Sequence, residues 1–193
     1  MTTTSTQPTK QPKAAKKMSP VRRRLLTALA TFVVLLAGYC VFSIAHPTVL
    51  RSQLEVDATP DQVWKVLTDR EAYPSWNPFI VSSTGDLEAG GTITNVLRDT
   101  TGQETTFTPE LLKVDPGREL RWIGKVGFGG IFDGEHSFRI EPLPGGRARL
   151  IQQETFRGVA VPVMAGWLSS KIKPQFDAMN QALATRAAAA AQH

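Results

Sequence analysis

The chain has 193 residues, of which 41% are hydrophobic and 20% charged, and its formal net charge is +5. This composition is ordinary for a globular protein. The charge is uneven, because residues 1–24 hold seven basic side chains and no acidic one, which leaves 15 basic against 17 acidic groups in the other 169 residues. A mildly acidic remainder argues against a nucleic-acid partner.

The N-terminal segment predicts a tail followed by a membrane span. Residues 1–24 offer almost nothing to bury and predict a basic, disordered, cytoplasmic tail. Residues 25–45 contain no charge, and a helix of this length covers roughly 30 Å, the thickness of a bilayer core. Arg22, Arg23 and Arg24 precede this span, so the positive-inside rule places the N-terminus in the cytoplasm and the rest outside it. We therefore expect a single-pass protein of the cell membrane.

Two other interpretations of residues 25–45 stay open. Ser43 and Ala45 have the spacing of a signal-peptide cleavage site, although cleavable apolar regions usually run to only about 7 to 15 residues. A buried core helix is disfavoured because the segment has no polar face. Cys40, the only cysteine, lies in this segment, so an intramolecular disulfide is excluded.

Residues 48–193 are expected to form one domain, which begins with a strand at 49–58. Thr59, Pro60 and Gln62 have the pattern of a capping box, which predicts a helix ending near residue 69 or 70. A short turn rich in proline should follow, presenting the aromatic side chains of Tyr73, Trp76 and Phe79.

Strand-like runs then alternate with turn residues, which predicts a meandering antiparallel sheet. The runs are residues 80–86, 92–98, 104–114, 119–126, 132–141 and 147–156. After Gly158 the period becomes helical, with one apolar stripe formed by Leu168, Ile172, Phe176, Met179 and Leu183. Pro174 interrupts this helix and predicts a kink or two abutting helices.

Five segments in this order resemble the SRPBCC, or START-like, superfamily and its polyketide cyclase/dehydrase-type branch. They are Ala58–Trp64 (ATPDQVW), Tyr73–Phe79 (YPSWNPF), Gly134–Phe138 (GEHSF), Glu154–Gly158 (ETFRG) and Met179–Leu183 (MNQAL). The resemblance covers residues 51–187. It implies an α+β helix-grip fold, a curved antiparallel sheet of about seven strands wrapped on a long C-terminal helix, here with an added N-terminal transmembrane helix. It also implies a hydrophobic ligand between sheet and helix, with chemistry in only some branches.

His136 is the most informative polar residue. Strand alternation puts it on the inward face with Phe138, and a hairpin around Pro144 would place it opposite Glu154. Three interpretations stay open: a hydrogen-bonding site for a ligand head group, a general base whose basicity is raised by its carboxylate partner, or a buried pair that fixes strand register.

Aromatic side chains of the domain are candidates for the pocket wall, although core packing explains many such residues. With the polar pair, the candidate ligand-binding residues are Trp76, Phe79, Trp122, Phe128, His136, Glu154, Trp167 and Phe176. Trp76 and Trp167 are expected at the pocket mouth. The three histidines are too scattered for a metal site, and no nucleotide-binding or other cofactor motif is present.

We therefore expect a membrane-anchored binding protein for a hydrophobic small molecule or lipid. A cyclase or dehydratase using His136 and Glu154 is an alternative, and a non-catalytic interaction module at the cell surface is another. The expected partners are the lipid bilayer and the apolar ligand. The sequence names no protein partner and no cofactor, and it favours a binding function over an enzymatic one.

Overall fold

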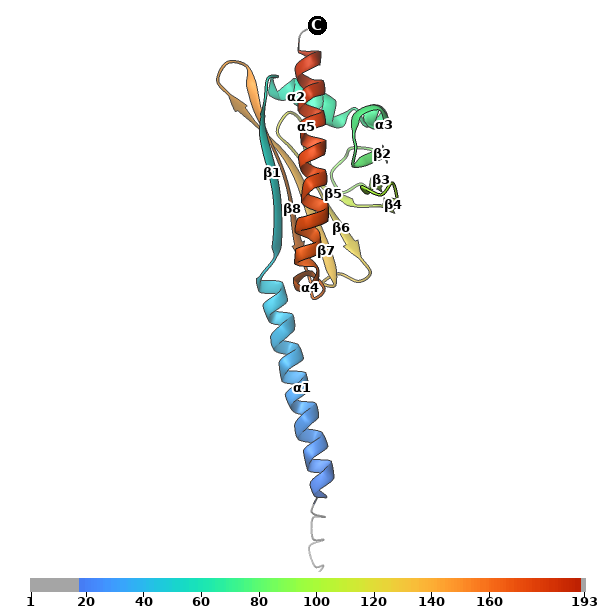
Figure 1. The fold of residues 1–193 in the computed structure, drawn as a ribbon, viewed down its shortest axis with the longest axis vertical. Helices are drawn as coiled ribbons and strands as arrows, with labels where there is room; N and C mark the ends of the chain where they lie inside the picture. The colour runs from blue at the N-terminus through green and yellow to red at the C-terminus, as the bar shows by residue number, and fades with distance from the viewer. Residues whose placement is uncertain (1–17, 192–193) are drawn as a thin grey trace, which may run out of the picture. The chain divides into compact units, whose positions relative to one another are not determined.

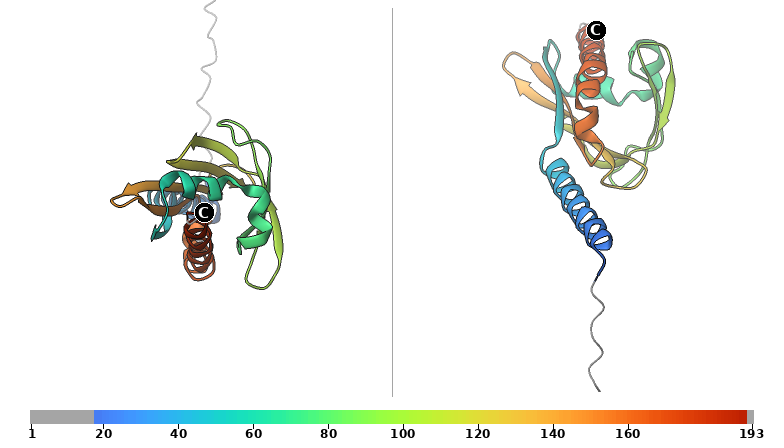
Figure 2. Two further views of the ribbon diagram at one scale, coloured as in Figure 1. Left: turned by 90° about the horizontal axis from the view of Figure 1, so that it is seen from above. Right: turned by 60° about the horizontal axis from the view of Figure 1, so that its bottom comes forward.

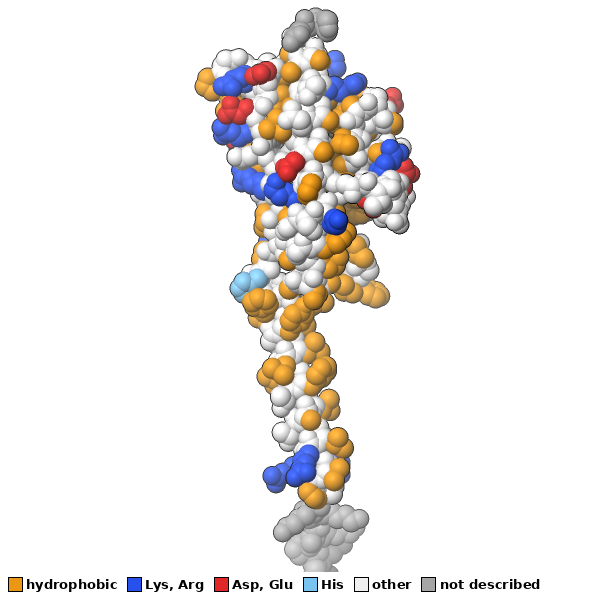
Figure 3. All heavy atoms as spheres, viewed as in Figure 1, with side chains coloured by type: hydrophobic (Ala, Val, Ile, Leu, Met, Phe, Trp, Pro, Cys, Tyr) orange, Lys and Arg blue, Asp and Glu red, His pale blue; other side chains and the backbone are white. Residues whose placement is uncertain are grey.

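The computed structural model describes residues 18–191, so most of the predicted disordered tail lies outside the described residues. The chain divides into two units, Met1–Gly38 and Tyr39–His193. Helix α1 (Pro20–Ala45) contains the predicted span, and most of its side chains are apolar and exposed (Figure 3). It is long and apolar enough to cross a membrane, and a signal sequence has the same properties.

The second unit is an α+β domain with eight strands. These are β1 (Thr48–Val56), β2 (Ile80–Thr84), β3 (Thr94–Arg98), β4 (Glu104–Phe107), β5 (Glu110–Asp115), β6 (Glu119–Val126), β7 (Phe132–Leu143) and β8 (Arg147–Arg157). Its helices are α2 (Pro60–Thr68), α3 (Tyr73–Trp76), α4 (Val161–Trp167) and α5 (Lys173–Ala190), with a 3₁₀ turn at Arg70–Ala72 and a π-helical turn at Leu168–Ile172.

The strands form two antiparallel sheets, with the orders β1-β8-β7-β6-β5 and β2-β3-β4. Helix α5 lies along one face of the five-stranded sheet, with β1 on one side and the smaller sheet on the other (Figures 1 and 2). This arrangement confirms the expected helix-grip architecture.

The structure differs from the predicted meander at one strand. The run expected at residues 104–114 is divided into β4 and β5 at Thr108 and Pro109. Proline has no backbone N–H and cannot continue a central ladder. As a result β4 pairs with β3 and β5 pairs with β6. Residues 90–93, just before β3, are joined to residues 109–111 by a bridge between Thr92 and Glu110 and by flanking backbone hydrogen bonds.

The predicted interruption of the C-terminal helix is confirmed. The backbone N–H of Lys173 donates to the carbonyl of Leu168, five residues back, before Pro174 begins the regular turns of α5. The π-helical register accommodates a proline that cannot donate a hydrogen bond and would crowd the preceding turn. The stripe then packs on the sheet, with Leu168, Phe176, Met179, Leu183 and Ala187 buried.

The capping box is also confirmed. The N–H of Gln62 donates to Thr59 Oγ1 at 3.4 Å, and the N–H of Thr59 donates to Gln62 Oε1 at 2.9 Å. In the aromatic turn, buried Asn77 accepts at Oδ1 from the N–H groups of Phe79 (3.0 Å) and Ile80 (2.9 Å). This side chain therefore joins α3 to β2.

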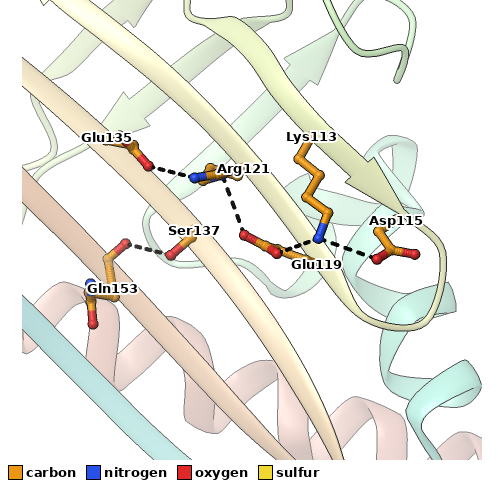
Figure 4. A network of polar contacts seen from close by, with 7 residues as sticks. All are labelled: Lys113, Asp115, Glu119, Arg121, Glu135, Ser137 and Gln153. Carbon is orange, nitrogen blue, oxygen red and sulfur yellow. Dashed lines mark hydrogen bonds and ion pairs between the residues drawn. The ribbon is translucent and has the colours of Figure 1, made fainter.

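The outer face of the large sheet is solvated and carries alternating charges (Figure 4). Lys113 Nζ lies 2.7 Å from Glu119, and Arg121 lies 3.4 Å from Glu119 and 3.0 Å from Glu135. Partly exposed pairs of this kind contribute little to stability. They show that the side chains of opposite parity point inward.

We predict that Asn77→Ala lowers the free energy of unfolding by about 2 kcal/mol, because it leaves two buried N–H groups without an acceptor. Urea unfolding of the full chain in a mild detergent, followed by tryptophan fluorescence, measures this change. Ser75→Ala, an exposed substitution in the same turn, is the control and should change stability by less than about 0.5 kcal/mol. Equal losses in the two variants would contradict the assigned role of Asn77.

Tyr73 predicts a dependence of stability on alkaline pH. Its hydroxyl is buried and donates to the carbonyl of Leu67 at 2.6 Å. Burial raises its pKa above the usual 10.0, and the nearby Arg70 opposes this effect only in part. The folded protein therefore keeps the phenol proton at a pH where the unfolded chain loses it, so stability falls as pH rises above 10.

We expect the wild-type protein to lose about 1.4 kcal/mol per pH unit more than Tyr73→Phe does above pH 10. The measurement is urea unfolding of both proteins between pH 9 and 11.5. The variant should also show a constant loss from the missing hydrogen bond. Parallel curves across this range would show that Tyr73 ionises equally in the folded and unfolded chains.

Candidate ligand-binding site

The inner face of the large sheet carries a polar patch under α5. Strand pairing places His136 between Trp122 on β6 and Glu154 on β8, and it places Phe138 opposite Gln152 in the next row. The predicted register of His136 and Glu154 is therefore confirmed. Side chains of one parity share a face, so all five point toward the helix.

Both ring nitrogens of His136 face protein groups. Nδ1 lies 3.4 Å from Glu154 Oε2, and Nε2 lies 3.1 Å from the amide nitrogen of Gln152. An amide nitrogen is only a donor, so Nε2 accepts and the ring proton resides on Nδ1, facing the carboxylate. Glu154 and Gln152 thus hold the imidazole in one orientation.

Aromatic rings enclose the imidazole. Trp122 stacks on it with centroids 4.7 Å apart and an angle of 11° between the planes, and Phe138 lies at 5.0 Å. Phe176 of α5 meets the imidazole edge-on at 5.0 Å and also contacts Phe79, with those centroids 5.7 Å apart. His136 is only 3% exposed. The surroundings are apolar apart from Glu154 and Gln152.

A missing side chain at Gly134 makes room for Glu154. A Cβ atom at Gly134 would lie 2.6 Å from Glu154 Oε1 and 3.4 Å from the ring of Phe156. No real Cβ atom approaches an oxygen so closely. The glycine therefore lets the carboxylate fold over the strand toward His136.

Gln152 in this patch and Asn180 on α5 carry three buried amide atoms that have no hydrogen-bond partner among residues 18–191. They are Gln152 Oε1 and both polar atoms of the Asn180 side chain, and the two residues are fully buried. Gln152 also donates weakly to Met179 Sδ at 3.9 Å, which ties the patch to α5. An unpaired buried amide group costs about 1–3 kcal/mol, so these atoms are suited to a polar group of a ligand.

Sequence reasoning did not single out these two amides. Gln152 shares its parity with Glu154, and Asn180 follows Met179 of the apolar stripe. A polar residue inside a hydrophobic pattern was the only signal available.

The structure brings together five of the eight candidate ligand-binding residues: Phe79, Trp122, His136, Glu154 and Phe176. It does not bring the other three to this patch. Trp76 lines a shallow groove of about 610 Å³ beside the outer side of α5. Phe128 and Trp167 are exposed, in the β6–β7 loop and at the end of α4.

Among residues 18–191, no cluster of three or more His, Cys, Asp or Glu side chains is arranged to hold a metal ion.

The family described as "Polyketide cyclase / dehydrase and lipid transport" matches residues 47–188. The chain belongs to this family. The polar patch, Gly134 and all but the last two residues of α5 fall inside the matched region. No curated protein matches the chain in sequence.

Solved structures share the helix-grip fold of this family member at low identity. The aromatase/cyclase Zhui from Streptomyces sp. R1128 has 20% identity and a TM-score of 0.59, over 74% of this chain and 94% of that one. A protein from Thermus thermophilus has 16% identity and a TM-score of 0.59, over 74% and 98% of the two chains. A protein from Nitrosomonas europaea has 16% identity and a TM-score of 0.58, over 76% and 97%.

We predict that Gly134→Ala separates Glu154 from His136 and destabilises the domain by about 1–3 kcal/mol, because the new methyl group overpacks the inner face. The ¹⁵N shifts of the His136 ring should then move away from the pattern of a single tautomer protonated at Nδ1. Gly129→Ala is the control, since the nearest atom to its Cβ is Asp133 Oδ2 at an ordinary 3.9 Å. Unchanged ring shifts in Gly134→Ala would contradict the role of this glycine.

Proposed function

We propose that the protein is a single-pass, membrane-anchored binding protein for a hydrophobic small molecule or lipid, held between the large sheet and α5. The observation that carries the proposal is the unpartnered amide oxygen of Gln152 beside an aromatic enclosure, together with the buried, unpartnered amide of Asn180 on α5. Membership of a family whose description includes lipid transport supports the same conclusion.

Anchoring rests on the charge pattern around α1. The helix carries Arg22, Arg23 and Arg24 in its first turns and no acidic or basic residue between Leu25 and Ala45. The positive-inside rule then places the N-terminus in the cytoplasm and the domain outside it. An apolar ligand concentrates in the adjacent bilayer. A tethered pocket can therefore take the ligand from the bilayer and does not depend on ligand dissolved in water.

The ligand we propose has an apolar body and one compact polar group. The rings of Trp122, Phe138 and Phe176 would contact the body, while Gln152 Oε1 and the Asn180 amide would bond the polar group. Phe176 and Met179 fill the space now, so binding requires them to shift. The flexible thioether of Met179 and the π-helical turn before α5 are the features that permit such a shift.

A cyclase or dehydratase function is the second candidate. The carboxylate of Glu154 orients the His136 ring, and this leaves Nε2 as the basic atom. Gln152 covers that atom at 3.1 Å, so proton abstraction from a substrate requires its amide to turn away. The shared fold with an aromatase/cyclase makes this chemistry worth testing.

We predict that native mass spectrometry of the full chain, released from membranes in a mild detergent, shows a discrete added mass that solvent extraction recovers as an apolar compound. Asn180→Leu should reduce the occupied fraction at least fivefold, because the ligand's polar group loses its partner. Gln181→Leu is the matched control on the outer side of α5, where Gln181 lines the shallow groove, and it should retain the ligand.

Loss of ligand in Gln181→Leu alone would move the site to the outer groove and contradict the interior site. A protein mass that stays free of ligand after exposure to membrane extract would contradict the binding function itself. Conversion of the bound compound to a new mass, abolished by Glu154→Gln, would favour the enzyme.

A further inference from the structure

Exposed hydrophobic side chains of the domain gather at one end. Between residues 46 and 191, seven large hydrophobic residues are exposed, and five of them lie at the end of β6, in the β6–β7 loop and on α4. These five, which we call the apolar lip, are Val126 (60% exposed), Phe128 (84%), Ile131 (40%), Val163 (82%) and Trp167 (51%). Single exposed apolar residues are common, but a cluster of this kind marks an interaction surface.

Backbone hydrogen bonds join the two segments of the lip, the β6–β7 loop and the residues that lead into α4. The N–H of Val159 donates to the carbonyl of Gly130, and the N–H of Ala160 donates to that of Ile131, both at 3.0 Å. Gly158 permits this approach, since its φ is +127° and a Cβ there would lie 2.4 Å from the Ile131 carbonyl oxygen. These contacts fix the backbone of the β6–β7 loop against the segment before α4, with the apolar side chains of the lip exposed.

Chain connectivity places this end of the domain beside the anchor. Only His46 and Pro47 separate the end of α1 from the start of β1. Thr48 pairs with Phe156, close to Gly158 and the segment that leads into α4. The start of β1, the β6–β7 loop and α4 lie at the same end of the domain (Figure 1). Two residues span at most about 7 Å, so the start of β1 stays within that reach of the end of α1.

Basic side chains border the lip. Lys125, Arg157 and Lys171 are exposed next to it in the sequence. Asp133 is the nearby acidic residue, and it accepts a hydrogen bond from the N–H of Gly130 at 2.8 Å. An apolar centre with basic neighbours suits the interface of a bilayer that contains anionic lipids.

We propose that the apolar lip inserts into the headgroup region of the same bilayer that anchors α1. The proposal rests on the anchoring part of the proposed function and adds a second, domain-borne membrane contact. The rings of Phe132 and Phe156, 5.3 Å apart, lie in the rows between the lip and the His136–Glu154 pair. Insertion of the lip would place these rings next to the lipid phase, so that a ligand would pass from the bilayer along an apolar path to the site.

The test uses nitroxide labels on the full chain in vesicles of phosphatidylcholine and phosphatidylglycerol. In a Cys40→Ser background, single cysteines are introduced by Phe128→Cys, Val163→Cys and, as a control, Pro144→Cys in the β7–β8 turn at the opposite end of the domain. We expect labels at 128 and 163 to be at least fivefold more accessible to oxygen, relative to a water-soluble nickel complex, than the label at 144.

Equal accessibility ratios at residues 128, 163 and 144 would overturn the proposal. Shielding of the lip labels from both reagents, together with spin–spin broadening between copies, would also overturn it in favour of a contact with a second chain. Native mass spectrometry of the same samples reads ligand occupancy separately, and an alkaline wash of the vesicles reads anchoring. An uninserted lip on an anchored, ligand-loaded protein therefore refutes this inference alone.

Discussion

The structure depends on the contact between one stripe of α5 and the inner face of the five-stranded sheet. Phe176, Met179 and Leu183 are fully buried there. Each such side chain contributes about 1.5–3 kcal/mol when it leaves water. The capped helix α2 and the aromatic turn pack around the same core. Because α5 lies along this face (Figure 1), its position decides whether the interior is closed or open to a ligand.

Buried polar groups in this interior lower the stability of the fold unless they are paired, so their presence indicates a functional role. His136 and Glu154 satisfy each other, and Gln152 completes the imidazole's hydrogen bonds. Asn180 receives no such compensation among the described residues. A leucine at that position would fit the apolar stripe, so the amide makes sense only if it meets a polar partner during the protein's work. The binding function proposed here supplies one.

Most of the fold could be predicted because its signals are local. Alternation along β7 and the turn at Pro144 were enough to pair His136 with Glu154, and Thr59 with Gln62 marked the start of α2. The division between β4 and β5 depended on one proline whose effect was not anticipated.

The site was harder to predict because it depends on contacts between distant segments. Sequence alone could not show that Gln152 and Asn180 lack partners, or that Phe128 faces outward while Phe176 faces inward. The sequence does not distinguish an aromatic residue that lines a pocket from one that packs in the core or lies in an exposed loop.

The short link at His46 and Pro47 limits the distance over which the domain could carry a bound ligand. A carrier that moves between two membranes needs a long, flexible tether or none, and this chain has two residues between span and strand. Under the proposed anchoring, a domain held so closely would work at a fixed position on its own membrane. A ligand taken from that membrane would then return to the same leaflet or pass to a mobile acceptor that reaches the domain.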